Sequence, residues 1–142
     1  MDPLKLENQL CFPLYAAAKE VVRRYRPFLD PLGLTYTQYI AMMVFWEHKS
    51  ITVGKLGEML CLDSGTLTPM LKKMEMAGLI TRQRSKDDER VVTATITPKG
   101  EELREKALEV PAKMMSCVSI SKEEAVTLLS ILKKLLNSEN NN

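Results

Sequence analysis

The chain has 142 residues, a formal net charge of +2, 45% apolar residues and 27% charged residues. This length suits one domain with a real core, and the composition excludes disordered and membrane-spanning classes. Without a long apolar run or a signal-peptide pattern, we expect a cytoplasmic protein with no membrane partner. Three cysteines and one histidine favour free thiols over a disulfide framework, and we expect no metal site and no cofactor.

Residues 4–26 carry apolar side chains at helical spacing and predict a long first helix. Pro13 interrupts this pattern and leaves two possibilities. The helix either bends near Cys11, or it begins there with Pro13 in its first turn. The proline-containing segment 26–33 then ends the helix.

A second helix is predicted from Thr35 to about His48. Thr35 and Gln38 have the spacing of a capping box, in which each side chain bonds the backbone of the other residue. Phe45 and Trp46 are expected in the core. His48 has no second ligand candidate nearby, so it does not indicate a metal site.

Two short amphipathic helices are predicted within residues 52–77, the first capped by Thr52 and the second by Asp63. Two helices joined by so short a turn indicate a helix-turn-helix. The side chains that these helices direct toward a core are Val53, Leu56, Met59, Leu60, Leu67, Met70, Leu71 and Met74.

After Gly78, which is expected to end the second of these helices, the apolar period changes from about 3.6 to 2. Residues 79–84 and 91–97 therefore predict two strands of a hairpin, and residues 85–90 form its charged tip. A helix-turn-helix followed by such a hairpin is a winged helix.

The C-terminal part is predicted to be helical. Thr97 followed by Pro98 opens one helix, and Ser121 with Glu124 forms a capping box for the last one. The final residues, 138–142, are expected to be frayed.

We therefore expect a mainly α (α+β) fold, a winged helix-turn-helix at 35–97 with long helices at 1–34 and 98–142. The apolar stripes of these outer helices exceed what the small central region can cover. An exposed stripe of that length favours aggregation unless a partner covers it, so the terminal segments predict a homodimer interface.

A recognition helix needs short polar side chains for base edges and cations for phosphates, and an arginine at a wing tip can enter the minor groove. Asp88 is placed to hold the Arg90 guanidinium in a fixed orientation. Together these features predict double-stranded DNA as the partner, with a near-palindromic operator for a two-fold dimer. The candidate contact residues are Ser64, Thr66, Thr68, Lys72, Lys73, Arg82, Arg84, Lys86, Asp88 and Arg90.

Four segments resemble the organic hydroperoxide resistance regulators, a branch of the multiple-antibiotic-resistance regulator family. The resemblance covers nearly the whole chain, and the blocks around Cys11 and at 63–69 are more specific to this branch than the wing motif. The segments are Asn8-Gln9-Leu10-Cys11-Phe12, Leu32-Gly33-Leu34-Thr35-Tyr36-Thr37-Gln38-Tyr39, Leu62-Asp63-Ser64-Gly65-Thr66-Leu67-Thr68-Pro69 and Asp87-Asp88-Glu89-Arg90-Val91.

The resemblance implies a homodimeric repressor of peroxidase genes that leaves DNA when organic hydroperoxide oxidises an N-terminal cysteine. It implies that Cys11 is this redox sensor and that Tyr25 and Tyr36 stabilise its thiolate by hydrogen bonds. Cys11 and Tyr25 are fourteen residues apart on one predicted helix, which separates them by about 21 Å. If both contribute to one site, Tyr25 must come from the partner subunit.

We expect different roles for the other two cysteines. Cys117 lies where one subclass of these regulators carries a resolving cysteine, which implies a disulfide from Cys11 of one subunit to Cys117 of the other. Cys61 stands where related chains tend to carry an aromatic residue, which suggests a packing role. Met114 and Met115 are candidates for lining a pocket that admits a lipid-like peroxide.

Several alternatives remain open at this stage. Cys11 can be a buried apolar side chain on a helix stripe. A related repressor released by a small aromatic ligand would need no thiol switch, and a winged helix can bind a protein instead of DNA. An enzyme such as a thiol peroxidase is not expected, because the chain has no Cys-x-x-Cys recycling motif.

Overall fold

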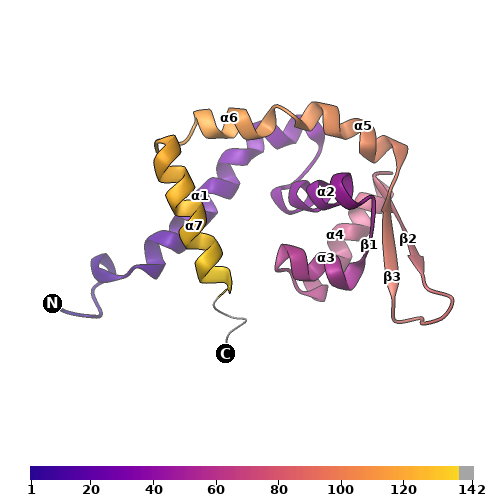
Figure 1. Cartoon of the computed structure of the whole chain (residues 1–142), viewed down its shortest axis with the longest axis horizontal. Helices are drawn as coiled ribbons and strands as arrows, with labels where there is room; N and C mark the ends of the chain where they lie inside the picture. Colours follow the sequence, from indigo (N-terminus) through magenta and orange to yellow (C-terminus); the bar gives the residue numbers. More distant parts are fainter. Residues whose placement is uncertain (138–142) are drawn as a thin grey trace.

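The computed structural model describes residues 1–137, so the frayed end expected for 138–142 lies outside the described residues. Figure 1 shows a winged-helix region at one end of the molecule and two helices, α1 and α7, at the other. The helices are α1 (Cys11–Leu29), α2 (Tyr36–His48), α3 (Val53–Leu60), α4 (Ser64–Met76), α5 (Pro98–Ala107), α6 (Val110–Ser116) and α7 (Lys122–Asn137), and the strands are β1 (Ser50–Thr52), β2 (Ile80–Arg84) and β3 (Val92–Ile96).

The first long helix, α1, begins at Cys11 with Pro13 in its first turn. This is the second of the two predicted possibilities, and it costs no hydrogen bond because the first N–H groups of a helix have no intrahelical partner. The other possibility, a helix from residue 4 that bends near Cys11, is excluded, since only a short 3-10 turn, Leu6–Asn8, precedes α1. The predicted end is early, because α1 continues through Pro27 to the buried Leu29.

Helix α2 forms the centre of the winged-helix region. Its capping box is present, since Thr35 Oγ1 accepts the Gln38 N–H at 3.3 Å and Gln38 Oε1 accepts the Thr35 N–H at 3.0 Å. Phe45 is fully buried, as expected. Trp46 is half-buried and donates its Nε1–H to the Gly100 carbonyl at 2.9 Å, which joins α2 to α5.

The predicted helix-turn-helix is confirmed as α3 and α4. Thr52 caps α3 through the Lys55 N–H, and Asp63 caps α4 through the Thr66 N–H. The prediction that Met59 lies in the core is wrong, because this residue is 43% exposed. Of the other side chains predicted for the core, Leu56, Leu67, Met70, Leu71 and Met74 are buried, and Val53 and Leu60 are half-buried.

The predicted hairpin is confirmed as β2 and β3, which pair antiparallel with Arg84 opposite Val92. Gly78 precedes it with a φ of +79°, a conformation that glycine adopts without strain. The sheet has a third strand that was not predicted, β1, which pairs with β3 to give the order β1-β3-β2. Strand β2 therefore lies at an edge of the sheet, beside α4.

The C-terminal region contains three helices where two were predicted, because the chain breaks at residues 108–109 between α5 and α6. The capping box at the start of α7 is present, with Ser121 and Glu124 bonding each other's backbone at 2.9 and 3.1 Å. Among the described residues, no helix combines the length and apolar character needed to cross a bilayer.

Candidate DNA interface and thiol site

Helix α4 presents its polar residues as a recognition helix would. Ser64, Thr66 and Thr68 are exposed on its first two turns, and Lys72 and Lys73 are exposed further along. The buried side of the same helix is anchored in the core, so the exposed side has a fixed orientation.

The Asp63 carboxylate fixes the start of α4. Its Oδ1 accepts the Thr66 N–H at 2.8 Å. This hydrogen bond lowers the pKa of Asp63, because it favours the ionised form. The N-terminal turn that carries the short polar side chains is therefore held by a charge-assisted cap.

The wing tip holds an arginine that is both exposed and oriented. The Arg90 side chain is 91% exposed, and its Nε donates to Asp88 Oδ1 at 3.2 Å. Asp88 Oδ1 also accepts the Arg90 backbone N–H at 3.0 Å, and these bonds lower the pKa of Asp88. Lys86 is exposed on the same loop.

The two arginines of β2 form hydrogen bonds within the chain, which changes the expectation for Arg82. Its Nη2 donates to Glu75 Oε1 of α4 at 3.3 Å, and only 24% of its side chain is exposed. Arg84 donates through Nη1 to the Glu89 carbonyl within the wing loop. A phosphate contact by Arg82 would require it to leave Glu75, so Arg82 does not belong with the freely exposed cations.

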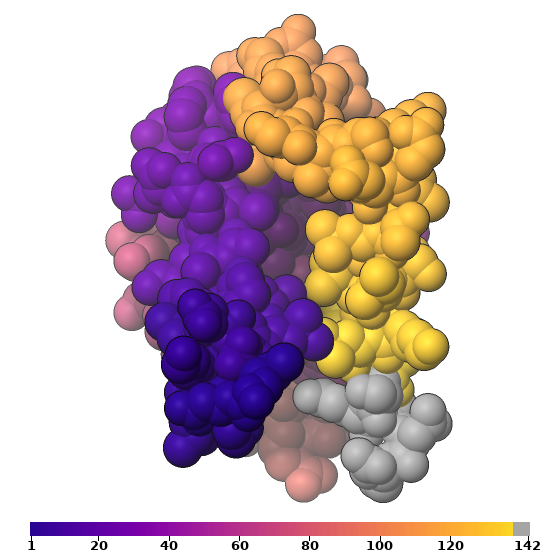
Figure 2. Space-filling model, turned by 90° about the vertical axis from the view of Figure 1, so that its left-hand side faces the viewer, coloured from indigo at the N-terminus to yellow at the C-terminus, as the bar shows by residue number. Residues whose placement is uncertain are grey.

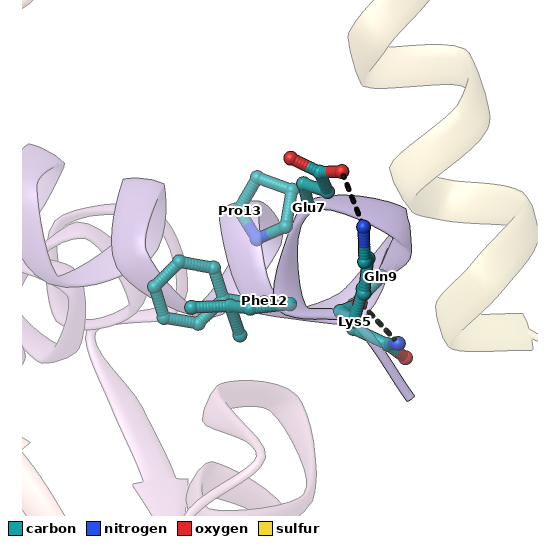
Figure 3. Close-up of a pocket in the computed structure, with 6 residues that line it drawn as sticks. Lys5, Glu7, Gln9, Phe12 and Pro13 are labelled. Atoms are coloured by element: carbon teal, nitrogen blue, oxygen red, sulfur yellow. Dashed lines mark hydrogen bonds and ion pairs between the residues drawn. The ribbon is translucent and has the colours of Figure 1, made fainter. Parts of the chain in front are cut away.

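Cys11 is exposed and is the first residue of α1. A helix N-terminus carries partial positive charge and unpaired N–H groups, which stabilise an anion such as a thiolate. A surface pocket lies beside it, formed where the preceding 3-10 turn meets α1. The residues that line this pocket are Lys5, Leu6, Glu7, Gln9, Phe12 and Pro13 (Figure 3).

Tyr25 and Tyr36 lie together, with ring centroids 4.9 Å apart. Sequence reasoning missed a third member, Tyr39, whose ring centroid is 5.8 Å from that of Tyr25. The i,i+3 spacing of Tyr36 and Tyr39 on α2 was the available signal. Burial raises the pKa of Tyr25 and raises that of Tyr39 to about 12, so both hydroxyls remain protonated donors at neutral pH.

Within one chain, this tyrosine cluster is far from Cys11. Helix α1 runs without a break from Cys11 past Tyr25, so fourteen residues separate them by about 21 Å. One protomer therefore does not bring Cys11 and its expected hydrogen-bond donors together.

Cys117 is exposed just after α6 and is held close to α1. Its carbonyl accepts a hydrogen bond from Arg24 Nη1 at 3.2 Å, and Arg24 Nε bonds Glu20 at 3.1 Å. Cys61 is also exposed, with a φ of +55° at the end of α3. The packing role suggested for Cys61 is therefore wrong, since this turn directs the residue to solvent.

A broad apolar surface runs over α1 and α7. Figure 2 shows the face on which the N-terminal segment and α7 stand on opposite sides of a hollow. Helix α7 has no buried residue among those described. Met115 is 49% exposed, whereas Met114 is buried, so only Met115 is available to an entering molecule. The large exposed apolar side chains of these two helices are Phe12, Leu14, Tyr15, Val21, Val22, Val126, Leu128, Leu129, Ile131, Leu135 and Leu136.

Comparison with known proteins identifies the family of this chain. The family model of the transcriptional regulator SarA/Rot matches residues 23–107, more than half of the chain. The organic hydroperoxide resistance transcriptional regulator of Bacillus subtilis is 52% identical over 135 residues, covering 95% of this chain and 92% of that protein.

The regulator AbfR, which has been solved from Staphylococcus epidermidis, resembles the chain in three states. Reduced AbfR bound to DNA has a TM-score of 0.81 and 32% identity, covering 96% of this chain and 93% of AbfR. Overoxidised AbfR bound to DNA has a TM-score of 0.73 and 34% identity, covering 92% and 94%. The disulfide form has a TM-score of 0.67 and 34% identity, covering 92% of each chain.

These relatives are transcriptional regulators and not enzymes, and they share both the sequence blocks and the winged helix. The resemblance and the fold class predicted from sequence are therefore confirmed. The chain belongs to the multiple-antibiotic-resistance-regulator-like family of DNA-binding, winged-helix transcriptional regulators, together with the SarA/Rot proteins and the organic hydroperoxide resistance regulator.

Proposed function

We propose that the chain is a homodimeric repressor that releases a near-palindromic operator when an organic hydroperoxide oxidises Cys11. The observation that supports this proposal best is the position of Cys11. It is exposed at the start of α1, within the apolar surface, and about 21 Å along the helix from Tyr25. A second subunit would supply the tyrosine hydroxyls that its own chain keeps distant.

The apolar surface on α1 and α7 supports the homodimer. Such a surface exceeds the isolated apolar side chains that are usual on a monomer, and a second copy covers it in the simplest way. We therefore assign residues 1–34 and 98–142 to dimerisation and residues 35–97 to DNA binding. Because α1 and α7 lie away from the wing (Figure 1), their pairing would set the spacing between two recognition helices.

The first chemical step is oxidation of the sulfur. The Cys11 thiolate attacks the terminal peroxide oxygen, a sulfur–oxygen bond forms and the oxygen–oxygen bond breaks. The leaving alkoxide takes a proton and departs as an alcohol, which leaves Cys11 as a sulfenic acid. The hydroxyls of Tyr25 and Tyr36 from the partner subunit would donate hydrogen bonds that stabilise the thiolate before the attack.

The second step is a disulfide to Cys117 of the other subunit. The Cys117 thiolate attacks the sulfenic sulfur, the sulfur–sulfur bond forms, and the hydroxyl leaves as water after protonation. Arg24 supports this role, because it holds the Cys117 turn beside the part of α1 that carries Tyr25, where Cys11 of the partner subunit would lie. AbfR has been solved in a disulfide form, which supports disulfide formation within this fold.

A non-reducing gel tests the disulfide. Wild type treated with cumene hydroperoxide is expected to migrate as a covalent dimer, whereas the Cys117→Ser variant stays at the monomer position. A Cys61→Ser control should behave as wild type. Covalent dimers of equal yield in the Cys117→Ser variant would exclude Cys117 as the resolving thiol.

Operator binding tests the whole proposal. In a gel-shift assay with the DNA upstream of the neighbouring gene, wild type and Cys61→Ser should release the duplex after cumene hydroperoxide. Cys11→Ser should bind equally well and ignore the peroxide. Release of Cys11→Ser by the peroxide, or release of wild type by a small aromatic acid alone, would instead favour a repressor without a thiol switch.

A further inference from the structure

Strand β2 directs Arg82 toward the protein. Successive side chains of a strand point to opposite faces, so Arg82 shares a face with Ile80, whereas Thr81 and Gln83 point the other way. Ile80 is 1% exposed and belongs to the core, and both Thr81 and Gln83 are exposed. Arg82 therefore lies on the face of the wing that packs against α4.

The carboxylate of Glu75, in the last turn of α4, bonds this position twice. Its Oε2 accepts the Arg82 backbone N–H at 2.9 Å, and its Oε1 accepts Nη2 at 3.3 Å. Because β2 is an edge strand, an outward N–H has no strand partner and needs another acceptor. The bond to the backbone ties the strand itself, and not only a mobile side chain, to the recognition helix.

The guanidinium of Arg82 is also enclosed. Its Nε is buried and has no hydrogen-bond partner within residues 1–137, and its side chain is 24% exposed. Arg90, by comparison, is 91% exposed at the wing tip. Arg82 would have to abandon a partly buried carboxylate to reach a phosphate, which leaves an uncompensated charge behind.

We infer that Glu75 and Arg82 form a brace that fixes the wing relative to the recognition helix, and that Arg82 is a positioning residue instead of a DNA contact. The inference rests on the proposed function only in requiring that α4 and the wing bind one operator together. With the wing held in place, α4 and Arg90 meet their grooves without a further loss of conformational freedom, so the brace strengthens binding.

The sign of the effect separates this role from simple electrostatics. Removing the negative charge of Glu75 should tighten DNA binding if only attraction to phosphates matters. The brace predicts the opposite. It also predicts that loss of Arg82 leaves the salt dependence unchanged, whereas loss of a phosphate contact lowers the slope of log affinity against log salt by about 0.9.

The experiment measures operator affinity of the reduced full chain by fluorescence anisotropy at several salt concentrations. Glu75→Met and Arg82→Met should each weaken binding by roughly tenfold without a change in slope, and the double variant should be no weaker. Glu75→Gln keeps one carbonyl oxygen for the Arg82 N–H and should restore part of the affinity. Glu101→Met, which removes an acid paired with Lys49 at 3.4 Å, should bind as wild type.

Two results of the binding experiment would overturn the brace: tighter binding by Glu75→Met, or a lower salt slope for Arg82→Met like that expected for Lys72→Met. Amide hydrogen exchange tests the brace without DNA. The Arg82 amide should exchange faster in folded Glu75→Met than in wild type, and the Thr95 amide should be unchanged. Equal exchange at Arg82 also overturns it. A wild type that binds no duplex overturns the proposed operator function instead, while this exchange still shows whether the brace exists.

Discussion

Arg82 and Arg90 lie eight residues apart on the same wing and have opposite surroundings. Sequence placed both among the DNA contacts, because both are cations near a predicted wing tip. The structure holds Arg82 against Glu75 of α4 and leaves Arg90 exposed beside Asp88. Asp88 was predictable because its partner is two residues away, whereas the Glu75 contact depends on how the strand packs against the helix.

Asp88 should support operator binding although its charge repels phosphate. Because it fixes the Arg90 guanidinium, Asp88→Ala is expected to weaken binding by roughly tenfold in an anisotropy titration. Asp87→Ala removes the same charge one residue earlier and should not weaken binding. Equal or tighter binding by Asp88→Ala would show that Arg90 needs no orientation.

The pH dependence of this effect follows from the lowered pKa of Asp88. Asp88 is fully ionised, and holds Arg90, at any pH well above the ordinary carboxyl pKa of about 3.9. The interaction is lost only when the pH falls through the lowered pKa of Asp88 in the folded protein. The affinity ratio of wild type to Asp88→Ala should therefore stay constant between about pH 5 and 8. A ratio that declines across this range would mean that another group controls Arg90.

At the scale of elements, local signals predicted most of the fold. The capping pairs Thr35 with Gln38 and Ser121 with Glu124 are complete within four residues, and both are present. Strand β1 was missed because three residues show no period and gain their partners only from β3. The break between α5 and α6 did have a local signal that went unused, since Pro111 stands in the first turn of α6, where proline often begins a helix.

The tyrosine cluster and the Cys117 turn show which parts of the candidate site the sequence could not predict. Cys11, Tyr25 and Tyr36 were named through family resemblance, but the packing of Tyr39 against Tyr25 depends on how α1 and α2 meet. The contact between Arg24 and Cys117 joins residues 93 positions apart. Local sequence patterns do not specify such distant pairs.

Gly100, in the first turn of α5, should tolerate no side chain. An added Cβ would lie 2.4 Å from the Leu79 carbonyl oxygen and 2.8 Å from Ile96 Cγ1. Gly100→Ala is therefore expected to lower the free energy of unfolding by about 2 kcal/mol, measured by urea denaturation. Gly54→Ala is the matched control, since its Cβ meets nothing within 4 Å, and in a helix it should raise stability by up to about 1 kcal/mol. A Gly100→Ala protein as stable as wild type would contradict this packing.

For the whole molecule, the proposed dimer depends on α7. Leu129 is 53% exposed in one protomer, so Leu129→Glu should leave each subunit folded and place a charge in the subunit interface. Light scattering after gel filtration should show a monomer, and operator affinity should fall by more than tenfold because the two recognition helices are no longer linked. Lys134→Glu, which lies about 140° around the same helix from Leu129, should remain dimeric. A dimeric Leu129→Glu would place the interface elsewhere.

The most direct test of the redox switch compares Cys11 in bound and released protein from one sample. Operator-bound protein is treated with less than one equivalent of cumene hydroperoxide, the released fraction is separated from the bound fraction, and the thiols of both are identified by mass spectrometry after alkylation. The account predicts oxidised Cys11 in the released protein and a free Cys11 thiol in the protein still on DNA. The same proportion of oxidised Cys11 in both fractions would contradict it.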